Sequence, residues 1–259
     1  MNLIIRSLTS LFYVSLLLGS LFIDGLLFSL IICVMTTLAI REIQRISKQK
    51  TPLSYLFFPL LFWAATNGKA AEVLTLTLGV LGVFFSLAYL SKKNLFFIGR
   101  AFITTLHLIG VAVPMVLLAI LGTTKPAYVA FIFGVIWLND SAAFLVGSWL
   151  GKQPLAPTIS PNKTIEGSLG GLVFTMVIMT FISSYFNVFN SNTALPIILI
   201  TAIMASLGDL VQSKLKRHCN VKDSGTILPG HGGMYDRIDS TLLALPIFIL
   251  LLYLFNYVS

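Results

Sequence analysis

Charged residues are scarce in this sequence, where they make up 10% of the 259 residues. Soluble domains carry roughly 25%. Apolar residues make up 57% of the chain. So few charges exclude an ordinary soluble domain and predict an integral membrane protein. Although the formal net charge is +8, nucleic acid is a poor partner because no soluble basic domain is present.

Cysteine is scarce too, with Cys33 in an apolar run and Cys219 in a charged stretch. Their surroundings differ so much that we expect no disulfide, and no metal-binding spacing is present. A small-residue cleavage site of the Ala-x-Ala kind is also missing after the first apolar run. We therefore expect no redox chemistry, and we expect the first run to be a retained helix.

Long apolar runs are abundant. Crossing a hydrocarbon core of ~30 Å takes about 20 apolar residues, and fewer where the bilayer is thin. We predict an all-α polytopic membrane protein with about nine transmembrane helices in a single membrane domain, 1–259, in which 101–259 carry the chemistry and 1–100 are N-terminal helices. The predicted segments are 8–23, 25–40, 52–66, 73–90, 101–121, 127–147, 168–186, 195–213 and 240–257.

The positive charges are distributed unevenly between the two ends of these segments. Fifteen of the seventeen Lys and Arg residues fall on one side, and only Lys69 and Lys125 fall on the other. Short cytoplasmic loops carry the excess of Lys and Arg in membrane proteins. We therefore expect a multi-pass protein of the bacterial inner (plasma) membrane with its N-terminus and charged loops in the cytoplasm.

One stretch, 206–240, holds four of the nine carboxylates, five of the seventeen Lys and Arg, and two of the three His. It lies between two apolar runs, and charge placed at a membrane face usually marks a functional site. Its first part is predicted as a helix that aligns Asp209, Ser213 and Lys216 on one face. A glycine-rich loop follows from about Lys222.

A second helix is predicted to start near Tyr235, so Asp209 and Asp236 can meet across the loop. Carboxylates with nearby basic residues suit Mg²⁺ and polyphosphate, because Mg²⁺ binds through one or two carboxylates and substrate oxygens. The plainer alternative is a solvated loop whose charges only mark the cytoplasmic side. Carboxylates inside the flanking helices and a His-Gly-Gly run argue against it.

A second cluster surrounds Asp140, which lies inside the sixth apolar run. A carboxylate there is costly unless it is paired or hydrated. The alternative is a structural contact made by the Asn139–Asp140 pair. In the following loop, Ser160, Lys163 and Thr164 could hold phosphate near the positive end of the next helix.

Two residues of the fifth run receive plainer interpretations. His107 is expected to be a hydrogen-bonded packing residue and not a ligand. Pro114 is expected to kink its helix, because proline removes one backbone hydrogen bond.

The run from Ser213 to Asp239 resembles the signature of the phosphatidate cytidylyltransferase (CDP-diglyceride synthase) family, S-x-x-K-R, then K-D, then P-G-H-G-G-x-x-D-R-x-D. Every fixed position matches, and a pattern with so many fixed polar residues is specific. Residues 140–167 also resemble the family's upstream block, D-x-x-A-Y-x-x-G followed by L-A-P-x-I-S-P-K-K-T-W-E-G. Phe144, Asn162 and Ile165 depart from it, which removes a phenol hydroxyl and one cation.

The resemblance implies cytidylyl transfer from CTP to phosphatidic acid at the inner leaflet, giving CDP-diacylglycerol and pyrophosphate for phospholipid synthesis. It implies Mg²⁺ held by Asp209 and Asp236, with a second cation left open. Membrane lipids are further partners, and a homodimer is left open. The implied catalytic residues are Asp209, Asp236, Lys222, His231 and Arg237. The implied substrate-binding residues are Asp140, Ser160, Lys163, Thr164, Ser213, Lys216, Arg217, Asp223, Gly232, Gly233 and Asp239.

Alternative functions remain at this point. A CTP-dependent lipid kinase, or a cytidylyltransferase for another lipid phosphate, would use similar residues. A transporter is disfavoured because the charges gather at one face, and no paired broken helices appear in two halves.

Overall fold

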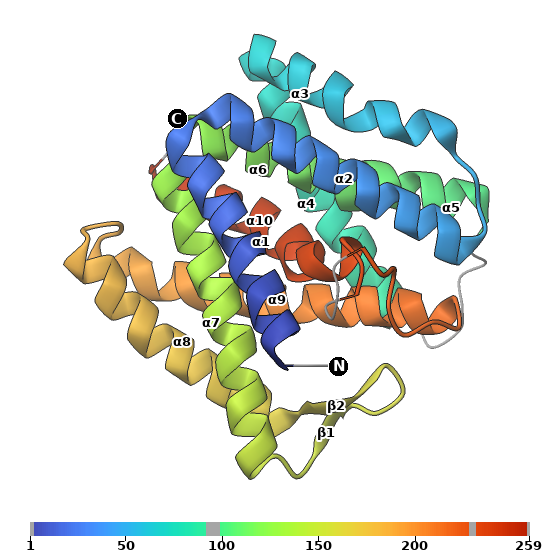
Figure 1. Cartoon of the computed structure of the whole chain (residues 1–259). Helices are drawn as coiled ribbons and strands as arrows, with labels where there is room; N and C mark the ends of the chain where they lie inside the picture. The colour runs from blue at the N-terminus through green and yellow to red at the C-terminus, as the bar shows by residue number, and fades with distance from the viewer. Residues whose placement is uncertain (1–2, 92–98, 228–231, 258–259) are drawn as a thin grey trace.

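The computed structural model describes residues 3–91, 99–227 and 232–257. These residues form helices packed into one bundle, with a small hairpin at one end (Figure 1). The helices are α1 (Leu3–Ile23), α2 (Gly25–Ser47), α3 (Phe57–Asn67), α4 (Lys69–Ser91), α5 (Arg100–Thr105), α6 (Val113–Thr124), α7 (Pro126–Leu150), α8 (Ile165–Tyr185), α9 (Ser191–His218) and α10 (Tyr235–Leu254).

Seven helical segments in the described part of the chain are long and apolar enough to cross a membrane. They are α2, α4, the segment Ala101–Thr124, and α7 to α10. The apolar part of α1, Leu8–Ile23, is shorter, and α3 has 11 residues after a short 3-10 helix, η1 (Pro52–Leu56). All nine predicted segments are helical, so the all-α polytopic fold is confirmed. Whether α1 and α3 also cross stays a prediction.

The fifth segment is interrupted by a π-helical stretch, η2 (Leu106–Ala112), between α5 and α6. Pro114, the second residue of α6, has no N–H to continue the α-helical pattern, so the preceding turn widens. Within this stretch His107 is fully buried, and its Nδ1 lies 3.0 Å from Thr51 Oγ1 and 3.1 Å from Ser54 Oγ. The packing role predicted for His107 is therefore confirmed.

Hydrogen bonds join helix ends that the charge count places on the same side of the membrane. On the side predicted as cytoplasmic, Lys214 Nζ of α9 donates to Tyr89 O at 2.7 Å and Leu90 O at 3.1 Å, at the end of α4. At the opposite end of the bundle, Tyr253 Oη of α10 donates to Glu72 Oε1 of α4 at 3.0 Å. The arrangement agrees with the predicted alternation of the helices.

The predicted loop between α7 and α8 contains an antiparallel hairpin, β1 (Pro154–Ala156) and β2 (Ser160–Thr164). It lies at the shared end of these two helices (Figure 1). Thr164 ends the hairpin and caps α8, because its Oγ1 accepts a hydrogen bond of 3.1 Å from Gly167 N. Short strands without a long alternating pattern gave no sequence signal for this hairpin.

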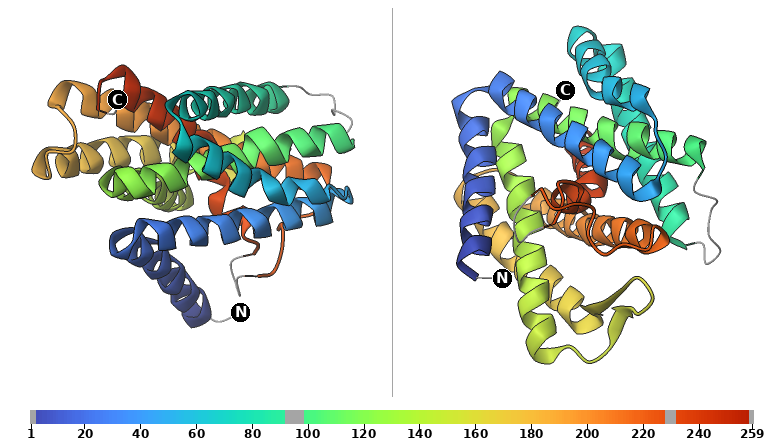
Figure 2. Two further views of the ribbon diagram at one scale, coloured as in Figure 1. Left: turned by 90° about the horizontal axis from the view of Figure 1, so that it is seen from above. Right: turned by 45° about the vertical axis from the view of Figure 1, so that its right-hand side comes forward.

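Helices α7 and α8 pack so closely that glycine is required between them. A Cβ on Gly171 would lie 2.8 Å from Ala143 Cβ and 2.9 Å from Asn139 O. The seam joins α7, α8 and the hairpin into one unit. By contrast, α1 stands at the edge of the bundle, at an angle to α2 (Figure 2).

Candidate active site

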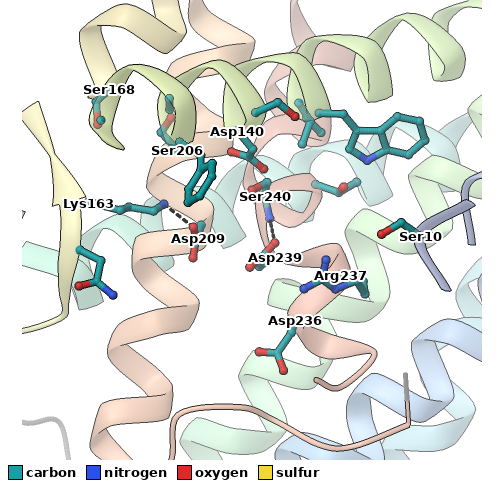
Figure 3. Close-up of a pocket in the computed structure, with 18 of the residues that line it drawn as sticks. Ser10, Asp140, Lys163, Ser168, Ser206, Asp209, Asp236, Arg237, Asp239 and Ser240 are labelled. Carbon is teal, nitrogen blue, oxygen red and sulfur yellow. Dashed lines mark hydrogen bonds and ion pairs between the residues drawn. The ribbon is translucent and has the colours of Figure 1, made fainter. Parts of the chain in front are cut away.

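A cavity of about 710 Å³ lies between α1, α7, α9, α10 and the hairpin (Figure 3). It collects residues of both clusters found in the sequence. The charged lining consists of Asp140, Lys163, Asp209, Asp236, Arg237 and Asp239. The apolar lining, from α1 and α7, includes Val14, Phe133, Ile136, Trp137 and Phe144.

Lys163 on β2 points toward Asp209 on α9, and its Nζ makes an ion pair with Asp209 Oδ2 (Figure 3). The other carboxylate oxygen of Asp209 accepts a hydrogen bond of 3.1 Å from Ser213 Oγ, one turn further along α9. The predicted alignment of Asp209 and Ser213 on one helix face is therefore confirmed. The side chains of Lys163 and Asp209 keep 30% and 24% of their surface exposed, so both can contact a ligand.

Both carboxylate oxygens of Asp236, at the start of α10, are occupied by hydrogen-bond donors. Oδ1 accepts from Lys216 Nζ at 2.6 Å and from Gln212 Nε2 at 3.2 Å. Oδ2 accepts from Ser224 N at 2.8 Å and from Gly233 N at 2.9 Å, and Ser224 Oγ lies 2.9 Å away. Asp236 therefore fastens α9 and the loop to α10, and Lys216 is committed to this ion pair.

Asp140 and Asp239 face the same space as Asp209 (Figure 3). In the described part of the chain, neither has a Lys or Arg within ion-pair distance. Asp239 Oδ1 accepts a hydrogen bond of 2.7 Å from Ser240 N. With four carboxylates and two cationic side chains in its lining, the cavity has an excess of negative charge, which favours a bound cation.

The neighbouring residues Asn139 and Asp140 have different surroundings. Asn139 is buried, and its Nδ2 donates to Ser206 Oγ of α9 at 3.0 Å. Asp140 lies on the adjacent face, which lines the cavity. The structural contact that was the alternative explanation for this pair is therefore made by Asn139. Asp140 faces the cavity and can contact a ligand.

The oxygen ligands of the cavity fit a hard divalent cation. Within the described ranges, no three side chains from His, Cys, Asp and Glu come together as a complete metal site. Such a partial donor set suits Mg²⁺, which takes one or two carboxylates and completes its shell with substrate phosphate and water. Asp209 and Asp236 both line the cavity, and their role as metal ligands stays a prediction.

Backbone contacts hold the hairpin that carries Lys163. Arg217 of α9 donates from Nε to Ile159 O at 3.3 Å, and from Nη1 to Val221 O at 3.3 Å. Glu166 of α8 accepts from Lys152 N at 3.1 Å. Arg217, predicted to bind phosphate, thus ties the hairpin to α9 while remaining exposed.

Other predicted residues surround the cavity without lining it. Lys222 and Asp223 are exposed on the loop after α9. Gly232 adopts a left-handed conformation with φ of 80°, which glycine tolerates without strain. Thr164 lines the cavity, and His231 lies outside the described residues. The remaining predicted residues outside the lining are Ser160, Ser213, Lys216, Arg217 and Gly233.

Sequence reasoning missed contributions from the first two helices. Tyr13 of α1 lines the cavity, and Glu42 of α2 is buried against the loop and the start of α10. A signal for Glu42 was present, because it follows Met35 by seven residues and Ala39 by three, which places it on the buried face of α2. Tyr13 gave no comparable signal.

Comparison with known proteins gives consistent matches. A model of the cytidylyltransferase family matches residues 4–255. A phosphatidate cytidylyltransferase of Staphylococcus aureus (strain COL) is 50% identical over 127 residues, covering 48% of each chain. One from Bacillus subtilis (strain 168) is 48% identical over 137 residues, covering 50% of this chain and 48% of that protein. The matched part of the chain spans about half the length of these curated relatives.

Proposed function

The chain belongs to the cytidylyltransferase family, and we propose that it transfers the cytidylyl group of CTP to phosphatidate, forming CDP-diacylglycerol and pyrophosphate. The observation that carries the proposal is the mixed lining of the cavity. Carboxylates and basic side chains suit a metal-bound nucleotide, whereas the apolar residues of α1 and α7 suit the acyl part of a lipid.

In the proposed reaction, a phosphate oxygen of phosphatidate attacks the α-phosphorus of CTP. A new P–O bond forms as the bond to the β-phosphate breaks, and pyrophosphate leaves with the electron pair. A phosphate monoester has a second pKa of about 6, so the lipid phosphate is largely a dianion at neutral pH and needs no strong base. The remaining difficulty is to bring two anions together.

Basic side chains of the cavity can reduce the repulsion between the two anionic substrates. Lys163 and Arg237 line it from opposite elements, β2 and α10. Arg237 has no ion pair with the described residues, so its guanidinium can take a phosphate without first leaving a carboxylate. Lys163 would exchange Asp209 for a phosphate oxygen. Both residues act by orientation and charge neutralisation, which dominate phosphoryl chemistry.

The carboxylates would hold the cation. Asp209 and Asp236 are the proposed Mg²⁺ ligands, and Asp236 would have to exchange at least one of its present donors, such as Lys216, for the cation. Asp239 supports them because it faces Asp209 and has no cationic partner in the described part of the chain. When bound, Mg²⁺ would neutralise phosphate charge and polarise the phosphate oxygens. Asp140 would complete the polar wall on the α7 side. A second cation is left to measurement.

Substrates of such different solubility must meet at a membrane surface. We place the site at the inner leaflet of the bacterial plasma membrane, facing the cytoplasm, on the strength of the fifteen-to-two charge count. The lipid would enter sideways past α1, because its acyl chains leave the bilayer only at high cost. CTP would enter from the aqueous side beside the hairpin.

Purified protein in detergent with Mg²⁺, phosphatidate and CTP labelled at either the α- or the γ-phosphate tests the proposal. We expect α-label in the lipid product and γ-label in pyrophosphate. Transfer of γ-label to the lipid, with release of CDP, would indicate a lipid kinase. No lipid product, together with ion or phosphate flux in proteoliposomes lacking CTP, would favour a transporter.

A further inference from the structure

Glu42 of α2 is a buried carboxylate, 4% exposed. Its Oε1 accepts a hydrogen bond of 2.9 Å from Met234 N, and its Oε2 accepts from Tyr235 N at 2.9 Å. Ser224 Oγ also donates to Oε2, at 2.7 Å. These donors flank Asp236 on the loop and at the start of α10, so α2 is bonded directly to the segment that carries the candidate site.

The N-cap position of α10 has no capping side chain. The first backbone N–H groups of a helix have no partner within the helix, and a Ser, Thr, Asp or Asn at the N-cap usually satisfies one. Here the N-cap is Met234, whose side chain makes no capping bond. Glu42 supplies the missing acceptors from 192 residues earlier in the chain, and its negative charge suits the positive end of the helix dipole.

Glu42 and Asp236 hold the same short segment from two sides. Ser224 Oγ donates its single hydrogen to Glu42 Oε2 at 2.7 Å, and Ser224 N donates to Asp236 Oδ2 at 2.8 Å, so this one residue links both carboxylates. Glycine is needed here, since a Cβ on Gly233 would overlap Ser224 Oγ and Glu42 Oε2, and one on Gly225 would overlap Glu42 Oε1. Any shift of Glu42 is therefore transmitted to the backbone that holds Asp236.

Burying a carboxylate is costly unless it is paired or fully hydrogen-bonded. Across the described part of the chain, no Lys or Arg forms an ion pair with Glu42. Its three donors all come from the loop and α10. A residue that only anchored α2 among its neighbours would need no such charge.

We propose that Glu42 is a positioning residue for the active site, which fixes the start of α10 and, through Ser224, the carboxylate of Asp236. The activity readout of this inference rests on the proposed cytidylyl transfer. Misplacing reacting groups by about 1 Å can cost about 100-fold in rate. Under this proposal, the N-terminal helices take part in catalysis through the geometry of the site.

The test compares wild type with Glu42→Gln, Glu42→Asp and the control Glu72→Gln. Glu72 of α4 also bonds α10, through Tyr253 Oη at the opposite end. Glutamine keeps the size of Glu42, but its NH₂ group would face backbone N–H donors, so at least one bond is lost. The measurements are CDP-lipid formation at varied CTP and phosphatidate, and amide hydrogen exchange of the segment 232–236.

We expect Glu42→Gln to lower kcat by at least about 50-fold, with KM for phosphatidate within about twofold of wild type. Amides at Met234 and Tyr235 should exchange at least about tenfold faster, since their acceptors are disturbed. Glu42→Asp keeps the charge on a shorter side chain and should recover part of kcat. Glu72→Gln should match wild type in both measurements.

Wild-type turnover and unchanged exchange in Glu42→Gln would overturn the inference, as would equal losses in Glu72→Gln. An inactive wild-type protein would instead remove the proposed function, and exchange would still test Glu42. Should Glu42→Gln fail to fold, Ser224→Ala removes a single donor and provides the second test. Faster exchange at Tyr235 supports the inference there, and unchanged exchange contradicts it.

Discussion

Lys163 on β2 and Asp209 on α9 neutralise each other through an ion pair between elements that are far apart in sequence. A phosphate bound at Lys163 would free Asp209 for a cation, and a cation at Asp209 would free Lys163 for a phosphate. Binding of nucleotide and binding of metal should therefore favour each other, and this coupling is reciprocal.

Asp209→Asn is expected to abolish turnover at ordinary Mg²⁺ concentrations while the protein still folds. The change keeps the size of the side chain but removes a full charge from an oxygen-ligand site. CDP-lipid formation per folded molecule is the measurement. Asp24→Asn is the control, because Asp24 caps α2 by accepting from Leu27 N at 2.7 Å, and Asn caps helices equally well. Wild-type turnover in Asp209→Asn would remove the metal-site proposal.

Asp236→Asn is expected to abolish turnover and also to lower thermal stability. Its carboxylate accepts four hydrogen bonds, from Gln212, Lys216, Ser224 N and Gly233 N, and an amide can satisfy only part of this set. Thermal unfolding in detergent, measured beside Asp209→Asn, separates the two effects. Equal stability of both variants would contradict the fastening role assigned to Asp236.

Arg237→Ala is expected to raise KM for CTP or lower kcat by at least about tenfold, through loss of a charge-assisted phosphate contact. Lys50→Ala is the matched control, since Lys50 is exposed, lies outside the cavity lining and belongs to the same predicted membrane side. The family resemblance implies a catalytic role for Lys222 as well, so Lys222→Ala is expected to behave like Arg237→Ala. Similar losses in Arg237→Ala and Lys50→Ala would show that general surface charge, and not a site, is responsible.

Single thiols at positions 190 and 220 should report the orientation of the bundle. Asn190 and Asn220 are both exposed, before and after α9. In intact cells an impermeant reagent should label the thiol at 190, while the thiol at 220 should react only after permeabilisation. Native Cys219 is a slow internal reference, because burial raises the pKa of its thiol and lowers its thiolate fraction. The reverse labelling pattern would invert the proposed topology.

Gly171→Ala should destabilise the protein by about 1–3 kcal/mol, because the added methyl group overpacks the α7–α8 seam. Gly19→Ala in α1 is the control, since nothing lies within 4 Å of a Cβ at that position. There alanine should be neutral or stabilising by up to about 1 kcal/mol, through its better helix propensity. Thermal unfolding of both purified variants tests this prediction. Equal stabilities would mean that α7 and α8 can move apart enough to accept the added methyl group.

Sequence reasoning located the helices well, because apolar runs of this length have few other structures open to them. It also brought Asp140, Lys163, Asp209 and Asp239 into one expected site, which they form around a single cavity. The β1–β2 hairpin was missed because its strands are too short to show a pattern. Which carboxylate meets which cation was not predictable either, since contacts such as Lys163 with Asp209 depend on tertiary packing.

The loop after α9 shows a different limit of sequence reasoning. The family resemblance implies that Gly232 and Gly233 bind substrate, whereas in the structure Gly225 and Gly233 make room for Glu42. Glycines in a sequence indicate that the backbone packs closely against another group, but they do not identify that group. The group that occupies this space comes from α2, one of the N-terminal helices to which the sequence assigned no part in the chemistry.

Helix α10 is bonded to other helices near both of its ends, to Glu42 of α2 at its start and to Glu72 of α4 through Tyr253 near its end. A transmembrane helix normally adapts to a thinner or thicker bilayer by tilting. Tilting α10 alone would break one of these attachments, so α2, α4 and α10 must tilt together. Adaptation to lipid thickness should therefore fall to helices without such attachments, and the depth of Asp236 and Asp239 should stay constant between membranes.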